Sequence, residues 1–567
     1  MTNLKQCIEV NDLKDMLKKT GEIYGDRPAY KIRIAENNYK VFTHKEVREM
    51  IDGLGTALID LGLKGKRIAV IGENRYEWEI AYLSIVCGTG IVVPLDRSLP
   101  ENELKKLVER SEIEAIFYSQ KYEESLKKII HSGTGKLKHL ISMDSLEHKN
   151  GIYSEKELIE TGKRLIEQGN REFLDSKIDE EGMSIMLFTS GTTAESKVVS
   201  LSHKNIAINL MDIASILDVD SNDRILSFLP VHHVFGCTVG FLFSLYLGAQ
   251  TSFCDGIKHI VDNLKEYEIT FSSFVPAIYE NIYRNILKKL EKEGKLEQVQ
   301  EAMVKHRNDS MEEKKKIFKE IHEALGGHIR LLLSGAAALD PKVEQGFRDW
   351  GINLCQGYGL TETSPVVAVE TNTEFRVGSV GKTIPHVQAK LEDVDAEGMG
   401  ELVVKGPNIM LGYYENEEAT KEVLNDGWFR TGDLASIDED GYIFIKGRKK
   451  SVIVLKNGKN IFPEEMENLV NKIVGVKESF IFGKSTKEDK DDVKIYSKIV
   501  FDRDVVKEAY KVENMDEIYE AINNKVKEIN HTMPAYKAIK GIILSETPLI
   551  KTTTSKIKRQ EELKTIV

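Results

Sequence analysis

Short runs of apolar residues alternate with longer amphipathic stretches over the first two-thirds of the chain. Nearly continuous apolar runs that are separated by helical patterns are typical of parallel strands covered by helices on both faces. The pattern therefore predicts an α/β fold, with a large N-terminal region of stacked, mostly parallel sheets flanked by helices. The predicted strands are residues 67–72, 90–95, 115–119, 184–190, 224–230, 270–276, 329–335 and 352–359.

Two segments depart from this alternation. Residues 284–325 are dense in Lys and Glu at helical spacing, which predicts a pair of solvated helices. After residue 372 short strands are punctuated by glycine, as in GELVVKGP and GYIFIKGR, which favours an antiparallel, β-barrel-like subdomain over about 372–447.

Near residues 447–451 the pattern changes again, to that of a compact α+β unit. SVIVLKNGKN predicts a hairpin, PEEMENLVNKIV a helix with proline in its first turn, and AIKGIILS a strand. We therefore predict an N-terminal domain over 1–447 and a small C-terminal domain over 448–567. No internal repeat is visible.

Length and charge fit this division. A chain of 567 residues exceeds the size at which one core keeps growing. The net charge is −11, but residues 448–567 hold 24 Lys and Arg against 19 Asp and Glu. An acidic body with a mildly basic tail argues against general nucleic-acid binding and permits a small anionic ligand between the two. Chance surface composition explains the asymmetry equally well.

Cysteines and apolar runs indicate a reduced, cytoplasmic protein. Cys7, Cys87, Cys237, Cys254 and Cys355 form no C-x-x-C pair, and the N-terminus lacks the apolar core of a signal peptide. The longest apolar runs, 81–95 and 235–249, are fifteen residues each. Because a membrane span needs about 20 residues, we expect buried core and no transmembrane segment. Peripheral membrane contact stays open.

One loop, FTSGTTAESKVVSLSH at 188–203, has the small residues and the lysine of a phosphate-binding loop. Against the Walker A spacing it fails twice, because Ser196 stands at the second glycine and Val198 lacks the hydroxyl that would bind a metal. Backbone amides near Gly191 and the charge of Lys197 could still hold phosphate. The loop alone is equally compatible with an ordinary turn.

Seven further segments follow the loop in order: LPVHHVFG, SGAAALD, QGYGLTETSP, GELVVKGPNIMLGYY, WFRTGDL, GRKKSVIVLKNGKNIFPEEME and PLIKTTTSKIKRQEEL. With TSGTTAESK, this set resembles the adenylate-forming superfamily of acyl-CoA synthetases, adenylation domains and luciferase, from about residue 20 onward. LPVHHVFG, YGLTETSP and GRKKSVIVLKNGKNIFP look most like long-chain fatty acyl-CoA synthetases.

The resemblance implies a two-step reaction that uses ATP, Mg²⁺ and coenzyme A. A carboxylic acid, here a medium- to long-chain fatty acid, attacks the α-phosphate of ATP, and a thiol then displaces AMP. Bringing an anionic carboxylate onto a polyanion requires positive charge aimed at the transition state. Two alternatives remain: a ligase that loads an acyl carrier protein, and a catalytically impaired nucleotide-binding relative.

The resemblance also assigns residues to the phosphates and the metal. The β/γ-phosphate loop is implied to comprise Thr189, Ser190, Gly191, Thr192, Thr193 and Lys197. Glu362 matches the Mg²⁺ carboxylate, with Thr361 beside it, and Thr189 shares the metal and catalytic roles. The resemblance is incomplete here, because the family usually has glycine at Ala194, proline at Ser196 and glycine at Val198, residues on which the flexibility of such a loop depends.

Nucleoside contacts are implied at two further motifs. Tyr358, followed by Gly359, matches the aromatic that stacks on adenine, and Gly335, Ala336 and Ala337 match the opposite wall. Asp433 matches the acceptor for both ribose hydroxyls, and Arg448 also reaches the ribose. Without the resemblance, Tyr358 would be a core residue and TGDL an ordinary turn.

His233 aligns with the histidine at the mouth of the acyl pocket, and Phe235 with residues 236–247 could line that pocket. Core packing explains the apolar stretch nearly as well. Adjacent histidines cannot both face one metal in the way that i, i+4 pairs can, so we expect no zinc site at His232–His233.

Three residues are implied in a two-pose mechanism. Lys556 matches the catalytic lysine that bridges carboxylate and α-phosphate, although Ser555 replaces the usual glycine. Lys450 sits at the hinge about which the mobile C-terminal domain rotates, and Gly458 belongs to the loop that the rotation brings in.

Overall fold

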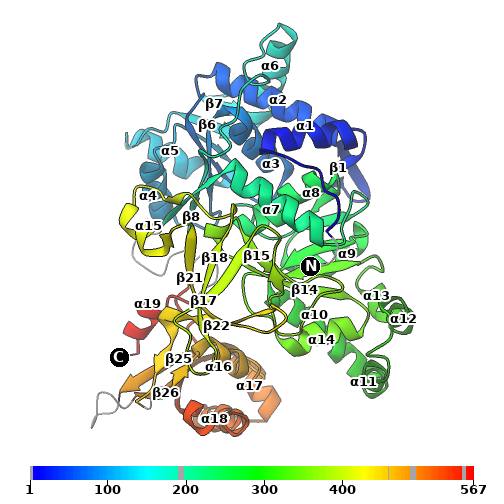
Figure 1. Cartoon of the computed structure of the whole chain (residues 1–567), viewed down its shortest axis with the longest axis vertical. Helices are drawn as coiled ribbons and strands as arrows, with labels where there is room; N and C mark the ends of the chain where they lie inside the picture. Colours follow the sequence, from blue (N-terminus) through cyan, green and yellow to red (C-terminus); the bar gives the residue numbers. More distant parts are fainter. Residues whose placement is uncertain are drawn as a thin grey trace.

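The computed structural model describes residues 4–133, 135–189, 197–456, 459–485, 493–551 and 557–566. Two large, mostly parallel sheets with covering helices form the upper part in Figure 1, and a small C-terminal unit lies at the lower end, beside an antiparallel sheet. The predicted fold class is confirmed. Within the described residues no helix is both long and apolar enough to cross a membrane.

The first large sheet has eight strands in the order β19-β9-β8-β4-β3-β5-β6-β7. Neighbours run parallel from β8 to β7, while β9 and β19 are antiparallel additions at one edge. Its strands are β3 (Arg67–Ile71), β4 (Ile91–Leu95), β5 (Ala115–Tyr118), β6 (His139–Ser142), β7 (Ile152–Ser154), β8 (Met183–Phe188), β9 (Val198–Ser202) and β19 (Gly412–Tyr413).

The second large sheet has nine strands in the order β16-β15-β14-β13-β12-β10-β11-β1-β2. Its centre, from β14 to β1, is parallel, and both edges are antiparallel. Its strands are β1 (Pro28–Ala35), β2 (Asn38–Thr43), β10 (Arg224–Ser227), β11 (Gln250–Phe253), β12 (Phe271–Phe274), β13 (Leu331–Ser334), β14 (Asn353–Gly359), β15 (Val366–Val369) and β16 (Lys382–Thr383).

Helices fill the space between the two sheets. Helix α7 (His203–Ile216) contacts β8 and β9, whereas the π-helical turn η3 (Gly236–Leu242) contacts β10 and β12, so the two sheets share one hydrophobic core. The expected core runs 81–95 and 235–249 are largely buried: most of their apolar residues lie in this core, and Val93 and Leu95 of β4 belong to another cluster on the first sheet. The other helices of this region are α1 (Leu13–Tyr24), α2 (His44–Asp60), α3 (Tyr76–Ser84), η1 (Ile85–Thr89), α4 (Glu101–Ser111), η2 (Gln120–Tyr122), α5 (Glu123–His131), α6 (Glu155–Glu167), α8 (Phe243–Leu247), η4 (Ile257–His259) and α9 (Ile260–Glu266).

Residues 284–325 form more than the predicted pair of helices, and they are not fully solvated. A capping box at Ser310 starts a separate helix. Buried Leu290, Met303 and Phe318 join a second hydrophobic cluster with strands β13 and β14, so one apolar stripe faces inward. The helices here are α10 (Pro276–Lys292), α11 (Leu296–Lys305), α12 (Met311–Ile317), α13 (Lys319–Ala324) and α14 (Pro341–Asp349).

The predicted antiparallel region is a five-stranded sheet in the order β17-β18-β21-β20, with β22 also paired to β21. Two strands of the predicted subdomain, β16 and β19, instead extend the two large sheets. The elements are β17 (Gln388–Glu392), β18 (Gly400–Lys405), α15 (Glu417–Val423), β20 (Leu424–Asn425), β21 (Trp428–Ile437) and β22 (Ile443–Arg448), preceded by η5 (Thr361–Thr363).

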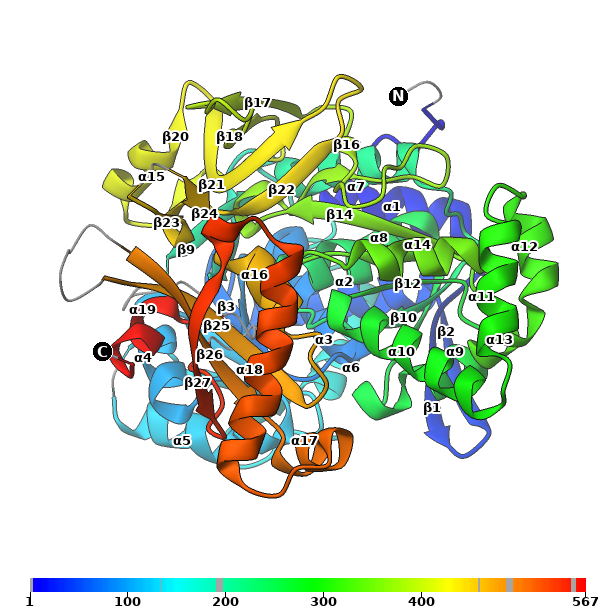
Figure 2. The same ribbon diagram turned by 90° about the horizontal axis from the view of Figure 1, so that it is seen from below.

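The C-terminal unit has the predicted hairpin, the helix with proline in its first turn, and the final strand. Seen from below in Figure 2, helix α18 covers the sheet β25-β26-β27. Its hydrophobic clusters contain only residues from 453 onward. The elements are η6 (Lys449–Ser451), β23 (Ile453–Val454), β24 (Asn460–Ile461), α16 (Pro463–Val470), β25 (Val476–Ser485), β26 (Val493–Phe501), α17 (Arg503–Tyr510), α18 (Met515–Thr532), η7 (Ala535–Lys537), β27 (Ile539–Ser545) and α19 (Arg559–Lys564).

One carboxyl group lies in the main core. Glu79 of α3 has no exposed surface, and burial raises its pKa from 4.5 to about 8. The unfolded chain loses this proton near pH 4.5, whereas the folded chain keeps it until about pH 8. The contribution of Glu79 to stability therefore falls as pH rises through this interval.

We expect Glu79→Gln to remove this pH dependence, because the amide stays neutral throughout. The variant should gain on the order of 4 kcal/mol relative to the parent between pH 5 and pH 9, at 1.36 kcal/mol per pKa unit. Thermal unfolding midpoints at both pH values measure the gain. Glu22→Gln, at an exposed position of α1, is the control, and an equal Glu79→Gln effect at both pH values would contradict the burial argument.

Candidate active site

The predicted site residues gather where parallel strands of the two large sheets end. Thr189 follows β8, Gly335 follows β13, and Tyr358 is the residue before the end of β14. Open α/β sheets bind ligands in the crevice outside the carboxyl ends of their strands.

Asn74 joins the carboxyl ends of the two sheets. It follows β3 of the first sheet, and its Nδ2 donates to Ser227 Oγ (3.1 Å) and to Leu229 O (2.7 Å), beyond β10 of the second sheet. Its Oδ1 accepts from Val231 N at 3.3 Å. The segment that carries the two histidines is therefore tied to the neighbouring sheet by a side-chain amide.

A buried carboxylate stands at the centre of the predicted nucleoside site. Asp433 of β21 is 5% exposed, and its Oδ2 accepts from Tyr358 Oη at 2.5 Å. Its Oδ1 lies 3.0 Å from Arg448 Nε, on the directly opposite strand β22. Burial, and next the charge of Asp433, raise the pKa of Tyr358 well above its usual range, so the phenol stays a donor.

The backbone around Asp433 is held in place by Thr431. Its Oγ1 donates to Leu402 O at 2.7 Å and accepts from Asp433 N at 3.1 Å. Arg448 also donates from Nη1 to Thr431 O at 2.9 Å. The structure thus brings three predicted nucleoside residues together, with Asp433 and Arg448 on the paired strands β21 and β22 and Tyr358 on β14.

Tyr413 connects the two residues predicted to act on the phosphates and the metal. Its Oη donates to Glu362 Oε1 at 2.9 Å, and the Nζ of Lys197 lies 4.4 Å from its ring centroid. Burial and then Glu362 raise the pKa of Tyr413, and the charge of Arg448 opposes that rise. Lys197 and Glu362 therefore both contact Tyr413, Lys197 at the ring and Glu362 at the hydroxyl.

The predicted phosphate loop is described only at its two ends. Thr189 donates from N (2.9 Å) and from Oγ1 (3.1 Å) to Lys197 O, so the two ends lie side by side at the end of the β8–β9 pair. Ser190, Gly191, Thr192 and Thr193 lie outside the described residues, as do Gly458 and Lys556.

The small residues at the predicted adenine wall differ in their exposure to solvent. Gly335 is buried, and a Cβ there would lie 2.9 Å from the ring of Phe235, whereas Ala336 and Ala337 are exposed. At Gly359 a Cβ would lie 1.8 Å from Pro365 O, so this glycine has a steric reason of its own. Thr361 begins η5, one residue before Glu362.

The segment with the histidines lies against the same wall. Beyond Phe235, Thr238 donates from Oγ1 to Ser364 O at 3.2 Å, next to η5. The apolar stretch 236–247 is buried, and Phe241 meets the ring of Tyr82 edge-on at 5.7 Å. Core packing thus accounts for this stretch, and its role in an acyl pocket stays a prediction.

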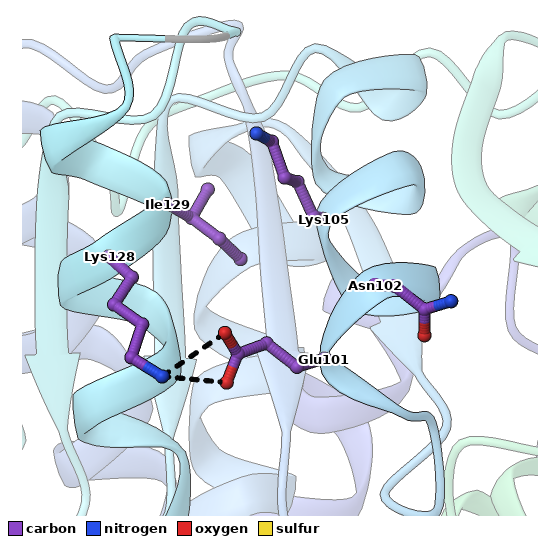
Figure 3. Close-up of a pocket in the computed structure, with 5 residues that line it drawn as sticks. All are labelled: Glu101, Asn102, Lys105, Lys128 and Ile129. Carbon is purple, nitrogen blue, oxygen red and sulfur yellow. Dashed lines mark hydrogen bonds and ion pairs between the residues drawn. The ribbon is translucent and has the colours of Figure 1, made fainter.

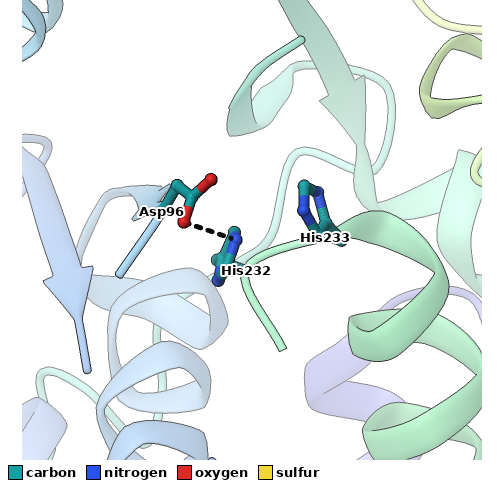
Figure 4. Close-up of side chains that lie close together, drawn as sticks. All are labelled: Asp96, His232 and His233. Atoms are coloured by element: carbon teal, nitrogen blue, oxygen red, sulfur yellow. Dashed lines mark ion pairs between the residues drawn. The ribbon is translucent and has the colours of Figure 1, made fainter. Parts of the chain in front are cut away.

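His233 is half-buried and stands beside His232, with ring centroids 4.3 Å apart. Figure 4 shows His232 between His233 and Asp96, with His232 Nε2 3.3 Å from Asp96 Oδ1. One ligand atom from each of the three residues lies within 4.8 Å of the others. The argument that adjacent histidines cannot face one ion is wrong here, because they occupy a tight turn, with His233 N bonded to Pro230 O, and not a regular element.

The predicted hinge residue Lys450 is exposed at η6. Its neighbour Lys449 is anchored, with Nζ 3.1 Å from Asp393 Oδ2 and 2.9 Å from Glu401 Oε2. Further on, Lys472 Nζ contacts Asp340 Oδ2 at 2.6 Å, an ion pair between the C-terminal unit and the large region.

A second candidate for ligand binding is a surface pocket between α4 and α5. Glu101, Asn102, Lys105, Lys128 and Ile129 line it, and Lys128 contacts both carboxylate oxygens of Glu101 (Figure 3). The charges of this pair satisfy each other at the surface, and none of the predicted site residues lines the pocket.

Sequence reasoning missed the residues that support the site. Tyr413 lies inside the motif GPNIMLGYY, and its position there was a usable signal. Asp96 directly follows the apolar run of β4, and Asn74 follows that of β3 after two residues, so the rule for strand ends would have singled out both. Thr431 carries no comparable signal.

Comparison with known proteins gives two family matches and several related chains. A model of the AMP-binding enzyme family matches residues 17–414, and a model of the AMP-binding enzyme C-terminal domain matches residues 450–565. The chain is 28% identical over 577 residues to long chain acyl-CoA synthetase 3 of Arabidopsis thaliana, covering 92% of this chain and 85% of that one.

Solved structures share the fold. The anthranilate CoA ligase AuaEII, in complex with anthranoyl-AMP, superposes with a TM-score of 0.77 at 19% identity, covering 98% of this chain and 97% of that one. ATP-bound MatB from Rhodopseudomonas palustris gives a TM-score of 0.73 at 22% identity, covering 98% and 99%.

Proposed function

This chain belongs to the AMP-binding enzyme family, and we propose on that premise that it is an AMP-forming acyl-CoA ligase. It would activate a carboxylic acid with ATP to the acyl-adenylate and then transfer the acyl group to coenzyme A. The observation that carries the proposal is the buried Asp433 between Tyr358 and Arg448, at the carboxyl ends of parallel strands.

The nucleoside would bind at this carboxylate. An ionised carboxylate accepts hydrogen bonds at both of its oxygens, so Asp433, held by Tyr358 and Arg448, would accept from the ribose hydroxyls. The ring of Tyr358 would stack on adenine, with Gly335 at the opposite wall. Small residues there and two acceptor oxygens fit a nucleoside better than they fit an ordinary turn.

The phosphates and Mg²⁺ would bind at the Lys197–Tyr413–Glu362 group. Glu362 accepts from Tyr413 at Oε1, and its carboxylate would offer oxygen to a hard cation together with the Thr189 hydroxyl at the end of β8. Mg²⁺, when bound, would neutralise phosphate charge. Lys197 would act as a point charge on the β- and γ-phosphates, with Ser190, Gly191, Thr192 and Thr193 supplying hydroxyls and backbone amides.

The proposed reaction has two steps. A carboxylate oxygen forms a bond to the α-phosphorus as the bond to pyrophosphate breaks, which gives a mixed anhydride. The thiol sulfur then attacks the acyl carbonyl, its proton is lost, and the bond to AMP breaks to leave the thioester. Lys556 would stabilise the negative charge that develops in the first step.

A medium- to long-chain fatty acid is our proposed substrate, in the cytoplasm. The named activity of the Arabidopsis relative supports it, as do the motifs LPVHHVFG and YGLTETSP. His233 and Phe235 would stand at the mouth of the acyl pocket. A carrier protein as acceptor, and an impaired relative that binds nucleotide without turnover, are the competing outcomes.

The decisive experiment measures pyrophosphate release with a series of free acids from two to eighteen carbons, with Mg-ATP and coenzyme A. We expect release to depend on the acid and to peak among medium or long chains, with AMP and acyl-CoA formed in equal amounts. Nucleotide binding without release would favour the impaired relative. Release that needs a phosphopantetheinylated carrier protein, with coenzyme A inactive, would favour the carrier ligase.

Asp433→Ala should weaken ATP binding by about ten-fold or more, since a hydrogen bond to a charged group contributes roughly 1.5–3 kcal/mol. Calorimetric titration with ATP measures the change. Asp440→Asn, in the exposed turn between the same two strands, is the matched control. Equal ATP binding by Asp433→Ala and the parent would mean that this carboxylate only holds β21 and β22 together.

Lys556→Ala and Lys450→Pro should separate the two half-reactions. Removing one preorganised donor typically costs on the order of 10²–10³ in rate, so Lys556→Ala should lose adenylate formation yet convert synthetic acyl-adenylate to thioester. Lys450→Pro fixes φ at the hinge and should do the reverse.

Pyrophosphate exchange and thioester formation measure the two half-reactions independently. Lys558→Ala controls for loss of a nearby charge, and Lys450→Ala removes the same side chain while leaving φ free. If both principal variants lose both half-reactions equally, the moving lysine and the hinge are incorrect for this protein.

A further inference from the structure

We propose that Asp96, His232 and His233 form a binding site for one divalent transition-metal ion, with Zn²⁺ as the best chemical match. The site lies in the crevice between the carboxyl ends of the two large sheets, because Asp96 follows β4 and the histidines follow β10. It is separate from the proposed Mg²⁺ position at Glu362.

The ligand atoms that these three residues offer indicate which metal ion would bind. Two imidazole nitrogens and one carboxylate oxygen suit Zn²⁺, whereas Mg²⁺ and Ca²⁺ prefer oxygen ligands alone. The three ligand atoms lie within 4.8 Å of one another. In a tetrahedral zinc site with bonds of about 2.0–2.2 Å, ligand atoms lie about 3.4 Å apart, so small side-chain rotations would close the site and leave a fourth position open.

His232 supplies a second, independent reason. Its side chain is 5% exposed, and among the described residues neither ring nitrogen has a hydrogen-bond partner, although Nε2 lies 3.3 Å from Asp96 Oδ1. Buried polar atoms are nearly always satisfied, and an unsatisfied one indicates a missing water or ion. A metal ion beside Asp96 would satisfy a nitrogen of His232 and attract the carboxylate at the same time.

The backbone under these side chains is fixed before any ion binds. Asn74 holds Leu229 and Val231 by hydrogen bonds, His233 N donates to Pro230 O at 3.0 Å, and Cys237 N donates to His233 O at 2.8 Å. Ligands on such a turn lose little freedom on binding. The ion would therefore link β4 of one sheet to β10 of the other and stabilise their junction.

Zinc binding can be measured without any catalytic assay. The full-length chain is stripped with a chelator and titrated with Zn²⁺ in competition with a chromophoric chelator, and Co²⁺ is added separately to read ligand-field bands in visible absorption. We expect one ion per chain and, because binding favours the folded state, a higher thermal unfolding midpoint with zinc.

Asp96→Asn, His232→Ala and His233→Ala should each weaken zinc binding by about ten-fold or more, and should lose the cobalt bands and the rise in midpoint. His148→Ala, which removes a histidine 3.4 Å from Glu157 at the surface, is the matched control and should bind as the parent does. Asp96→Asn preserves shape, so it remains informative if a histidine variant folds poorly.

Two results would overturn the proposal. One is a parent chain that binds no zinc at micromolar concentrations. The other is a folded Asp96→Asn chain, together with a folded His233→Ala chain, that binds zinc as tightly as the parent. None of these measurements uses ATP or a fatty acid. A negative result for zinc binding therefore does not affect the proposed ligase activity, and a negative result for that activity does not affect the proposed metal site.

Discussion

Asp433 lies on β21, accepts a hydrogen bond from Tyr358 of β14, and pairs with Arg448 at the end of β22. These strands belong to the second large sheet and to the antiparallel sheet, and Arg448 is the last residue before η6. A buried carboxylate is costly unless it is paired and hydrogen-bonded. Satisfying this charge therefore joins the antiparallel sheet to the end of β14 in the second large sheet, directly before the C-terminal unit.

The two large sheets meet under a similar constraint. They share one hydrophobic core through α7 and η3, but apolar packing is not directional. Directional contacts between the two sheets come from hydrogen bonds at the strand ends, such as those from Asn74 to Leu229 and from Tyr413 to Glu362. Both bonds connect segments far apart in sequence, and both lie where the candidate site residues gather.

Much of the fold could be predicted from sequence, because local patterns carry it. Buried strands such as β3, β5 and β13 are continuous apolar runs, and the proline at the start of α16 is a local signal. Between 284 and 325 the helical structure was predicted correctly, but the number of helices and their full exposure were wrong, because the charged residues hid an inward stripe that includes Met303 and Phe318.

The candidate site was predicted less completely. Motifs singled out Tyr358, Asp433 and Arg448, which the structure brings together, although their roles remain proposals. The sequence carries a signal for Tyr413 and for Asp96 as single residues, but it does not show that Tyr413 contacts Lys197 and Glu362 or that Asp96 contacts His232, because these partners are distant along the chain. It also failed for adjacent histidines, whose directions depend on a turn that local sequence rules do not describe.

The anchoring of Lys449 limits how the C-terminal unit can move. Asp393 and Glu401 hold this lysine against the antiparallel sheet, and Arg448 before it is held by Asp433. Any rotation then has to be absorbed by backbone torsions from Lys450 onward. The rotation would then start at a fixed point on the antiparallel sheet. In the two-pose mechanism that we propose, the C-terminal unit would therefore turn about a point that is already ordered, so little further chain entropy would be lost there.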